Sequence, residues 1–136
     1  MPPLSLYDSP PCDTRFVDGI LRGTMLGGWW GLVMGYHDSG LDGKQGAARA
    51  RYTARSAGRS GLLFGGWMGT YNGMHCYVER ARGEDDWVNA GVAGVAAGGI
   101  TAIARPSTRH PVAVLGTGLA SGAITASIDH YMKANR

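Results

Sequence analysis

The sequence is poor in charge, in cysteine and in any N-terminal targeting pattern. Charged residues make up 17% of its 136 residues, and it has two cysteines. Two cysteines cannot build a multiple-disulfide framework, and their separation matches no zinc-binding spacing. The first 15 residues show neither an apolar signal run nor an Arg-rich amphipathic pattern, so we expect any targeting information to be internal. The net charge of +3 comes without a basic face interleaved with aromatic residues, so a nucleic-acid partner is not expected.

Glycine, in contrast, is present in large excess. It supplies 23 of the 136 residues, whereas its usual share is about 7%. The chain is 44% hydrophobic, which is too apolar for an intrinsically disordered protein. The mean hydropathy is slightly below zero, but glycine and polar connections lower this average. The length is that of one domain.

Four stretches are low in charge and rich in small and apolar residues: 17–36, 61–78, 87–104 and 112–128. Each is about as long as a membrane-spanning helix, which needs roughly 17 to 25 residues. The polar stretch 37–60 and the proline-containing stretch 105–111 are predicted to be loops. The fold class that we predict is therefore all-α: an integral membrane bundle of four short Gly-rich transmembrane helices, forming a single domain over 1–136.

The spacing of the small residues predicts how these helices pack. Glycine recurs at every fourth position in the first two stretches, and glycine with alanine does so in the last two. A four-residue step keeps small residues on one stripe of a helix, and such stripes allow close helix packing in lipid. We expect the first two helices to pack on each other. The predicted packing glycines are Gly19, Gly23, Gly27, Gly31, Gly35, Gly61, Gly65, Gly69, Gly73, Gly94, Gly98, Gly118 and Gly122.

The distribution of charge predicts the topology. The loops 37–60 and 105–111 carry most of the basic residues, and basic loops collect on the side from which insertion occurs. Four spans place both loops on that side and both termini on the other. Cys12 precedes the first span and Cys76 ends the second, so both would lie at one membrane face. They could form a disulfide, worth about 4 kcal/mol on the chain-entropy model, or remain two free buried thiols.

Two patterns resemble catalytic or ligand-binding motifs, but both are incomplete. The segment 112–122 looks like a strand that enters a Gly-rich dinucleotide-binding turn, but an acidic residue is needed about 20 positions later, and the chain ends before that. The histidines, which are His37, His75, His110 and His130, have no ligand spacing and no evident nucleophile partner. We therefore predict no catalytic, cofactor or metal site, and we predict that the protein is not an enzyme.

The loop between the second and third spans, 79–86, and the third span carry a family resemblance. They read as basic residues, then acids, then an asparagine and a Gly-rich helix; the signature residues are Arg80, Arg82, Asp85, Asp86 and Asn89. This pattern resembles the translocase-of-the-inner-membrane superfamily of mitochondria, with one extra residue between the basic pair and the acids. Within it, 7–12 and 76–78 resemble an accessory membrane-arm subunit of respiratory complex I. The resemblance implies the mitochondrial inner membrane, termini in the intermembrane space and a disulfide near the N-terminus.

Two functional hypotheses follow from the resemblance. The first is a non-catalytic accessory subunit that supports the complex I membrane arm; its partners would be other membrane-arm subunits and membrane lipids, with structural lipid such as cardiolipin but no cofactor or small-molecule substrate. The alternative is a subunit of an inner-membrane protein-import translocase, which would present a polar groove. The groove candidates are few: Asp18, Arg22, Asn72 and His75. Asp18 and Arg22 form either an interfacial ion pair one turn apart or part of a polar cavity.

Overall fold

The computed structural model describes residues 10–136, which fold into four α-helices. They are α1 (Cys12–Leu41), α2 (Gly46–Arg82), α3 (Trp87–Ala104) and α4 (Pro111–Ala134), with the short 3-10 helix η1 (Pro106–Thr108) between the last two. No strand occurs in this part of the chain. The all-α prediction is therefore confirmed.

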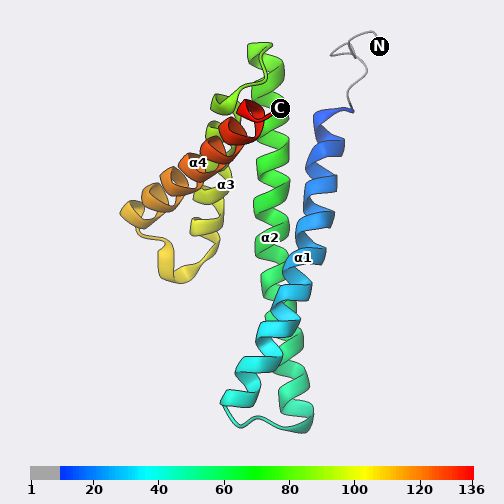
Figure 1. The fold of residues 1–136 in the computed structure, drawn as a ribbon. Coiled ribbons are helices and arrows are strands. Elements are labelled where there is room, and N and C mark those ends of the chain that lie inside the picture. Colours follow the sequence, from blue (N-terminus) through cyan, green and yellow to red (C-terminus); the bar gives the residue numbers. More distant parts are fainter. Residues whose placement is uncertain (1–9) are drawn as a thin grey trace.

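The helices lie in sequence order as a row (Figure 1). α1 packs against α2, α2 against α3 and α3 against α4. α4 also reaches α2 through a side chain, because Trp67 Nε1 donates a hydrogen bond to Ser121 Oγ at 3.3 Å. Within residues 10–136, α1 and α4 do not pack against each other. The described chain is therefore an open wall of helices with two free edges.

The packing is the reverse of that in a soluble protein. The buried side chains are small or polar: cysteine, alanine, Ser39 and Asn89, beside the glycines. Large apolar side chains point outward instead, and Met25, Leu62 and Val112 are 76%, 76% and 81% exposed. Soluble proteins bury such residues, whereas helices in lipid meet through small residues and leave large apolar ones to the acyl chains. This arrangement is that of a helical membrane bundle.

The predicted loop over 37–60 is wrong, because this stretch is helical apart from 42–45. Gly43 and Gly46, with φ of +68° and +59°, make the tight turn, a conformation that glycine adopts without strain. The helices continue to pack beyond the apolar stretch, since Arg49 Nη2 donates to the carbonyl of Tyr36 at 3.2 Å and its guanidinium stacks on the Tyr36 ring. The polar residues of 37–60 therefore do not mark the ends of the helices.

Three helices, α1, α2 and α4, are longer than the predicted stretches, whereas α3 covers the predicted 87–104. α1 has 30 residues and α2 has 37, or about 45 and 55 Å at 1.5 Å per residue, whereas the hydrocarbon core of a bilayer is about 30 Å thick. The α1–α2 hairpin is therefore long enough to extend well beyond a bilayer. Figure 1 shows its turn and the α3–α4 connection directed toward one end, and the α2–α3 connection and the C-terminus toward the other.

Two helices, α3 and α4, are long and apolar enough to cross a membrane by length and composition alone. α1 and α2 are long enough, but their glycines and polar aromatic residues lower their hydropathy. That all four helices span the membrane remains a prediction.

Candidate functional site

The seam between α1 and α2 admits no side chain at the α1 glycines that face α2. A Cβ atom added at Gly31 would lie 2.6 Å from the Ser56 carbonyl oxygen and 2.7 Å from the Ala57 Cα. One added at Gly23 would lie 2.5 Å from the Phe64 carbonyl oxygen. Real Cβ atoms do not approach backbone so closely, so only glycine allows this helix separation.

The seam between α3 and α4 is built in the same way. A Cβ atom at Gly94 would lie 2.9 Å from the Gly122 Cα, and one at Gly98 would lie 2.8 Å from the Thr117 carbonyl oxygen. The Thr125 hydroxyl donates across this seam to the Ala90 carbonyl at 2.9 Å. All 13 glycines that the spacing selected are buried, in one seam or the other.

A disulfide joins the start of α1 to the end of α2. Cys12 and Cys76 are bonded, with their Cα atoms 5.5 Å apart. Two polar contacts flank the bond: Arg15 pairs with Glu79 at 3.1 Å, and the Tyr77 hydroxyl donates to Asp13 at 2.9 Å. This end of the hairpin is therefore held by covalent, ionic and hydrogen bonds. The part of the predicted N-terminal motif that precedes residue 10 lies outside the described residues.

Three of the family-signature residues, Arg82, Asp86 and Asn89, form a hydrogen-bonded network at the α2–α3 connection. Gly83, with φ of +69°, ends α2. Arg82 then pairs with Asp86, with Nη2 2.9 Å from Oδ2, and donates through Nη1 to Asn89 Oδ1 at 2.7 Å. Asn89 is fully buried and donates to the Glu84 carbonyl. This amide therefore has partners for both its oxygen and its nitrogen.

Asp86 also caps α3. Its Oδ1 accepts from the backbone N–H groups of Val88 and Asn89 at 3.1 and 3.3 Å, an N-cap arrangement. The hydrogen bond from Arg82, assisted by these amides, lowers the pKa of Asp86 below its ordinary value. The remaining signature residues act separately: Asp85 pairs with Lys133 at 2.7 Å, and Arg80 donates to the Pro10 carbonyl.

The predicted groove residues do not form one groove. Asp18 and Arg22 pair with each other at 2.9 Å on an exposed face of α1, which is the interfacial-pair alternative. Asn72 packs toward α1, since a Cβ atom at Gly19 would lie 2.6 Å from its Nδ2. Only His75 belongs to a larger polar arrangement.

That arrangement is a row of side chains on α2, at four-residue steps, which we name the α2 ladder: Trp67, Tyr71, His75 and Glu79. The Trp67 and Tyr71 rings stack in parallel with centroids 5.4 Å apart, and the Tyr71 and His75 rings are 5.9 Å apart. His75 Nδ1 lies 3.9 Å from Glu79 Oε2. All four are partly exposed. Sequence reasoning missed the ladder because it followed the glycines, although the ladder has the same spacing.

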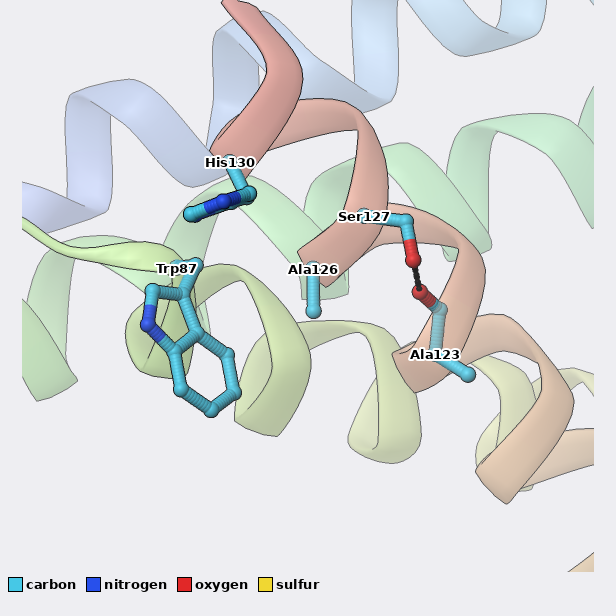
Figure 2. A pocket seen from close by; sticks show the side chains of 5 residues that line it. All are labelled: Trp87, Ala123, Ala126, Ser127 and His130. Carbon is cyan, nitrogen blue, oxygen red and sulfur yellow. Dashed lines mark hydrogen bonds between the residues drawn. The ribbon is translucent and has the colours of Figure 1, made fainter. Parts of the chain in front are cut away.

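A hollow of about 480 Å³ lies between the start of α3 and α4. Figure 2 shows Trp87 of α3 beside it, with His130, Ala126 and Ala123 following one another along α4. The Ser127 hydroxyl donates to the Ala123 carbonyl of its own helix at 2.7 Å. The hollow is wide open and mostly apolar, and over residues 10–136 no group of three or more His, Cys, Asp or Glu side chains could hold a metal ion.

Comparison with known proteins gives two matches. The Tim17/Tim22/Tim23/Pmp24 family matches residues 12–126, a range that includes parts of all four helices. The chain is also 39% identical over 111 residues to the outer envelope pore protein 16-4, chloroplastic, of Arabidopsis thaliana. That alignment covers 82% of this chain and 79% of the relative.

Proposed function

Because this chain belongs to the Tim17/Tim22/Tim23/Pmp24 family, we propose that it is a non-catalytic subunit of a protein-translocation pore in an organelle membrane. Family membership carries this proposal, and the α2 ladder supports it. Neither match supports the complex I role that the sequence resemblance suggested. The protein-import alternative therefore replaces the complex I role, but family membership does not specify which organelle membrane is involved.

The open wall of helices supports the role of a subunit and not that of a complete pore. A path for a hydrophilic substrate must be closed off from lipid all round, because lipid offers no hydrogen bonds to exposed polar groups. Within residues 10–136 the first and last helices of the wall do not meet. A second copy or another protein has to complete the enclosure.

The part of the α2 ladder from Tyr71 to Glu79 is the surface that we propose for the path. Tyr71 and His75 lie in a stretch of α2, 61–78, that contains no Asp, Glu, Lys or Arg and is flanked by α1 and α3, and Glu79 follows directly after it. Polar side chains at membrane depth are rare and usually face a protein interior or a water-filled cavity. Tyr71 and His75 are partly exposed, and they offer hydrogen-bonding groups without a fixed charge. Such a surface suits the passage of varied polypeptide segments.

The membrane that we propose is the outer envelope of the chloroplast. This proposal rests on the name of the relative, which describes that protein as chloroplastic and of the outer envelope. The mitochondrial inner membrane, which the sequence resemblance implied, is the second choice. In either membrane we propose that both termini lie on the face opposite the basic α1–α2 turn.

Site-specific photocrosslinking during protein import tests the translocation role. A photoreactive residue at Tyr71 or His75 should crosslink to a radiolabelled precursor arrested during import into isolated chloroplasts. The matched control is the same residue at Leu62, also on α2 and 76% exposed, which should crosslink to lipid and not to the precursor. Equal crosslinking from all three positions, or none from the ladder, would contradict the assigned path.

Two further outcomes would overturn the proposal. If the purified protein makes vesicles permeable to small solutes but the ladder never contacts a precursor, the substrate is not polypeptide. If the protein co-migrates with NADH dehydrogenase activity in two-dimensional native electrophoresis, the complex I role is restored.

A further inference from the structure

An apolar hollow lies between α2 and α3 near the end of the molecule where the basic connections lie. Leu63, Phe64 and Trp67 of α2 line it together with Thr101 and, just beyond α3, Arg105. Its volume is about 320 Å³, and most of its lining is apolar. A hollow with this lining suits a hydrocarbon chain, and Arg105 places one positive charge at its rim.

A second, basic hollow follows along the same side of α2. It has a volume of about 340 Å³, and its lining residues are Tyr52, Arg55, Ser56, Arg59 and Ser60. Arg59 precedes Leu63 by four residues, as Leu63 precedes Trp67, so these side chains lie on one helix face. One such step advances about 6 Å along a helix. The apolar and basic hollows are therefore neighbours on one surface.

The end of α3 shows where these hollows lie relative to a bilayer. α3 has 18 residues, or about 27 Å, which matches a hydrocarbon core of about 30 Å. α3 ends at Ala104, so Arg105 lies at the membrane surface. Because Arg105 borders the apolar hollow, that hollow lies just inside the hydrocarbon. Arg59 and Arg55 lie further out along α2, at the level of lipid phosphates.

The positive charges of this region have no acidic partner within the described chain. Arg55, Arg59 and Arg105 take part in no ion pair there, whereas Arg15, Arg22 and Arg82 each pair with a carboxylate. Arginine binds phosphate through two parallel N–H groups. Ser56 and Ser60 lie in the same hollow and can donate through their hydroxyls. This set of groups is complementary to a phosphate and not to a cation.

From this arrangement we infer that the α2–α3 seam binds an anionic glycerophospholipid, with an acyl chain in the apolar hollow and the phosphate against Arg55 and Arg59. Arg105 holds the lipid at the boundary between chain and headgroup. A zwitterionic lipid fits less well, because its ammonium group meets the same arginines. The site goes beyond the translocation role and does not depend on it.

Quenching of Trp67 by brominated lipid tests the inference, because Trp67 lines the apolar hollow. In the test protein, Trp29, Trp30 and Trp87 are replaced by phenylalanine, which leaves Trp67 as the single tryptophan. The protein is reconstituted in phosphatidylcholine vesicles that contain a minor fraction of either brominated phosphatidylglycerol or brominated phosphatidylcholine. An arginine near the surface favours anionic lipid about fivefold. We therefore expect the brominated phosphatidylglycerol to quench Trp67 several-fold more strongly at equal mole fraction.

Two double variants locate the effect. R55Q/R59Q removes the charges of the basic hollow and should reduce quenching by phosphatidylglycerol to the level of phosphatidylcholine. R51Q/R80Q removes the same number of charges, one beside the hollow and one at the opposite end, and should leave the preference intact. Equal quenching by the two lipids in the unmutated background would overturn the inference, and so would a preference that survives R55Q/R59Q or is lost in R51Q/R80Q.

Discussion

Replacing one of two adjacent glycines in α1 should destabilise the protein, whereas replacing the other should not. A Cβ atom at Gly27 would lie 2.5 Å from the Ser60 carbonyl oxygen and 2.6 Å from the Phe64 Cβ, while one at Gly28 would meet nothing within 4 Å. Neither neighbour of Gly27 is the flexible end of a side chain. Gly27→Ala therefore has to push α1 and α2 apart, and Gly28→Ala does not.

The size of the effect follows from these distances. Ordinary contact begins at 3.4 Å, so the two helices would have to separate by about 0.9 Å near residue 27. Overpacking of this kind typically costs about 1–3 kcal/mol. The gain in helix propensity from glycine to alanine is the same in both variants and cancels in their comparison. At roughly 3 °C per kcal/mol, Gly27→Ala should unfold about 3–9 °C below Gly28→Ala.

The assay is thermal unfolding of the two variants and the parent in one detergent, followed by tryptophan fluorescence with the disulfide intact. Gly28→Ala should match or exceed the parent. Equal midpoints for the two variants, or a lower midpoint for Gly28→Ala, would refute the assigned seam.

Three further predictions concern the ends of the bundle. Replacing Cys12 and Cys76 with serine should lower the free energy of unfolding by about 4 kcal/mol, measured by denaturant titration in detergent; an unchanged value would show that the bond contributes nothing. Arg82→Ala should lower the unfolding midpoint by several degrees because a buried amide loses its partner, whereas Arg80→Ala, with only an exposed contact, should barely change it. Since the pKa of Asp86 is lowered in the folded chain, its stabilising effect is complete above the ordinary carboxyl pKa and is lost as the pH falls through the lowered value. Proteolysis of the α2–α3 connection should therefore accelerate in acid, and Asp86→Asn should abolish that acceleration.

Features with a local signature could be predicted from the sequence. The four-residue glycine step predicted that the first two helices pack on each other, because a helix places such positions on one stripe whatever surrounds it, but it did not predict that α3 packs on α4. Arg82 and Asp86 are also four residues apart, but α2 ends at Arg82 and Asp86 is the N-cap of α3. Their pairing therefore depends on the turn at Gly83 and could not be predicted from helical spacing.

Features that depend on how helices are offset from one another could not be predicted in this way. The stretch 37–60 was expected to be a loop because it is polar, yet α1 and α2 continue through most of it by packing on each other. The α2 ladder could not be recognised from the sequence because its aromatic residues also suit contact with lipid. The hollow beside Arg105 arises only once the end of α3 is placed beside the middle of α2.

We propose that one face of α2 meets water within the membrane, while the large apolar side chains of the bundle meet lipid. Single cysteines at Tyr71, His75, Leu62 and Leu119, labelled in intact membranes with a water-soluble, membrane-impermeant maleimide, test it most directly. We expect rapid labelling at Tyr71→Cys and His75→Cys, and protection at Leu62→Cys and Leu119→Cys. Protection at both ladder positions, with labelling at the two leucine positions, would contradict it.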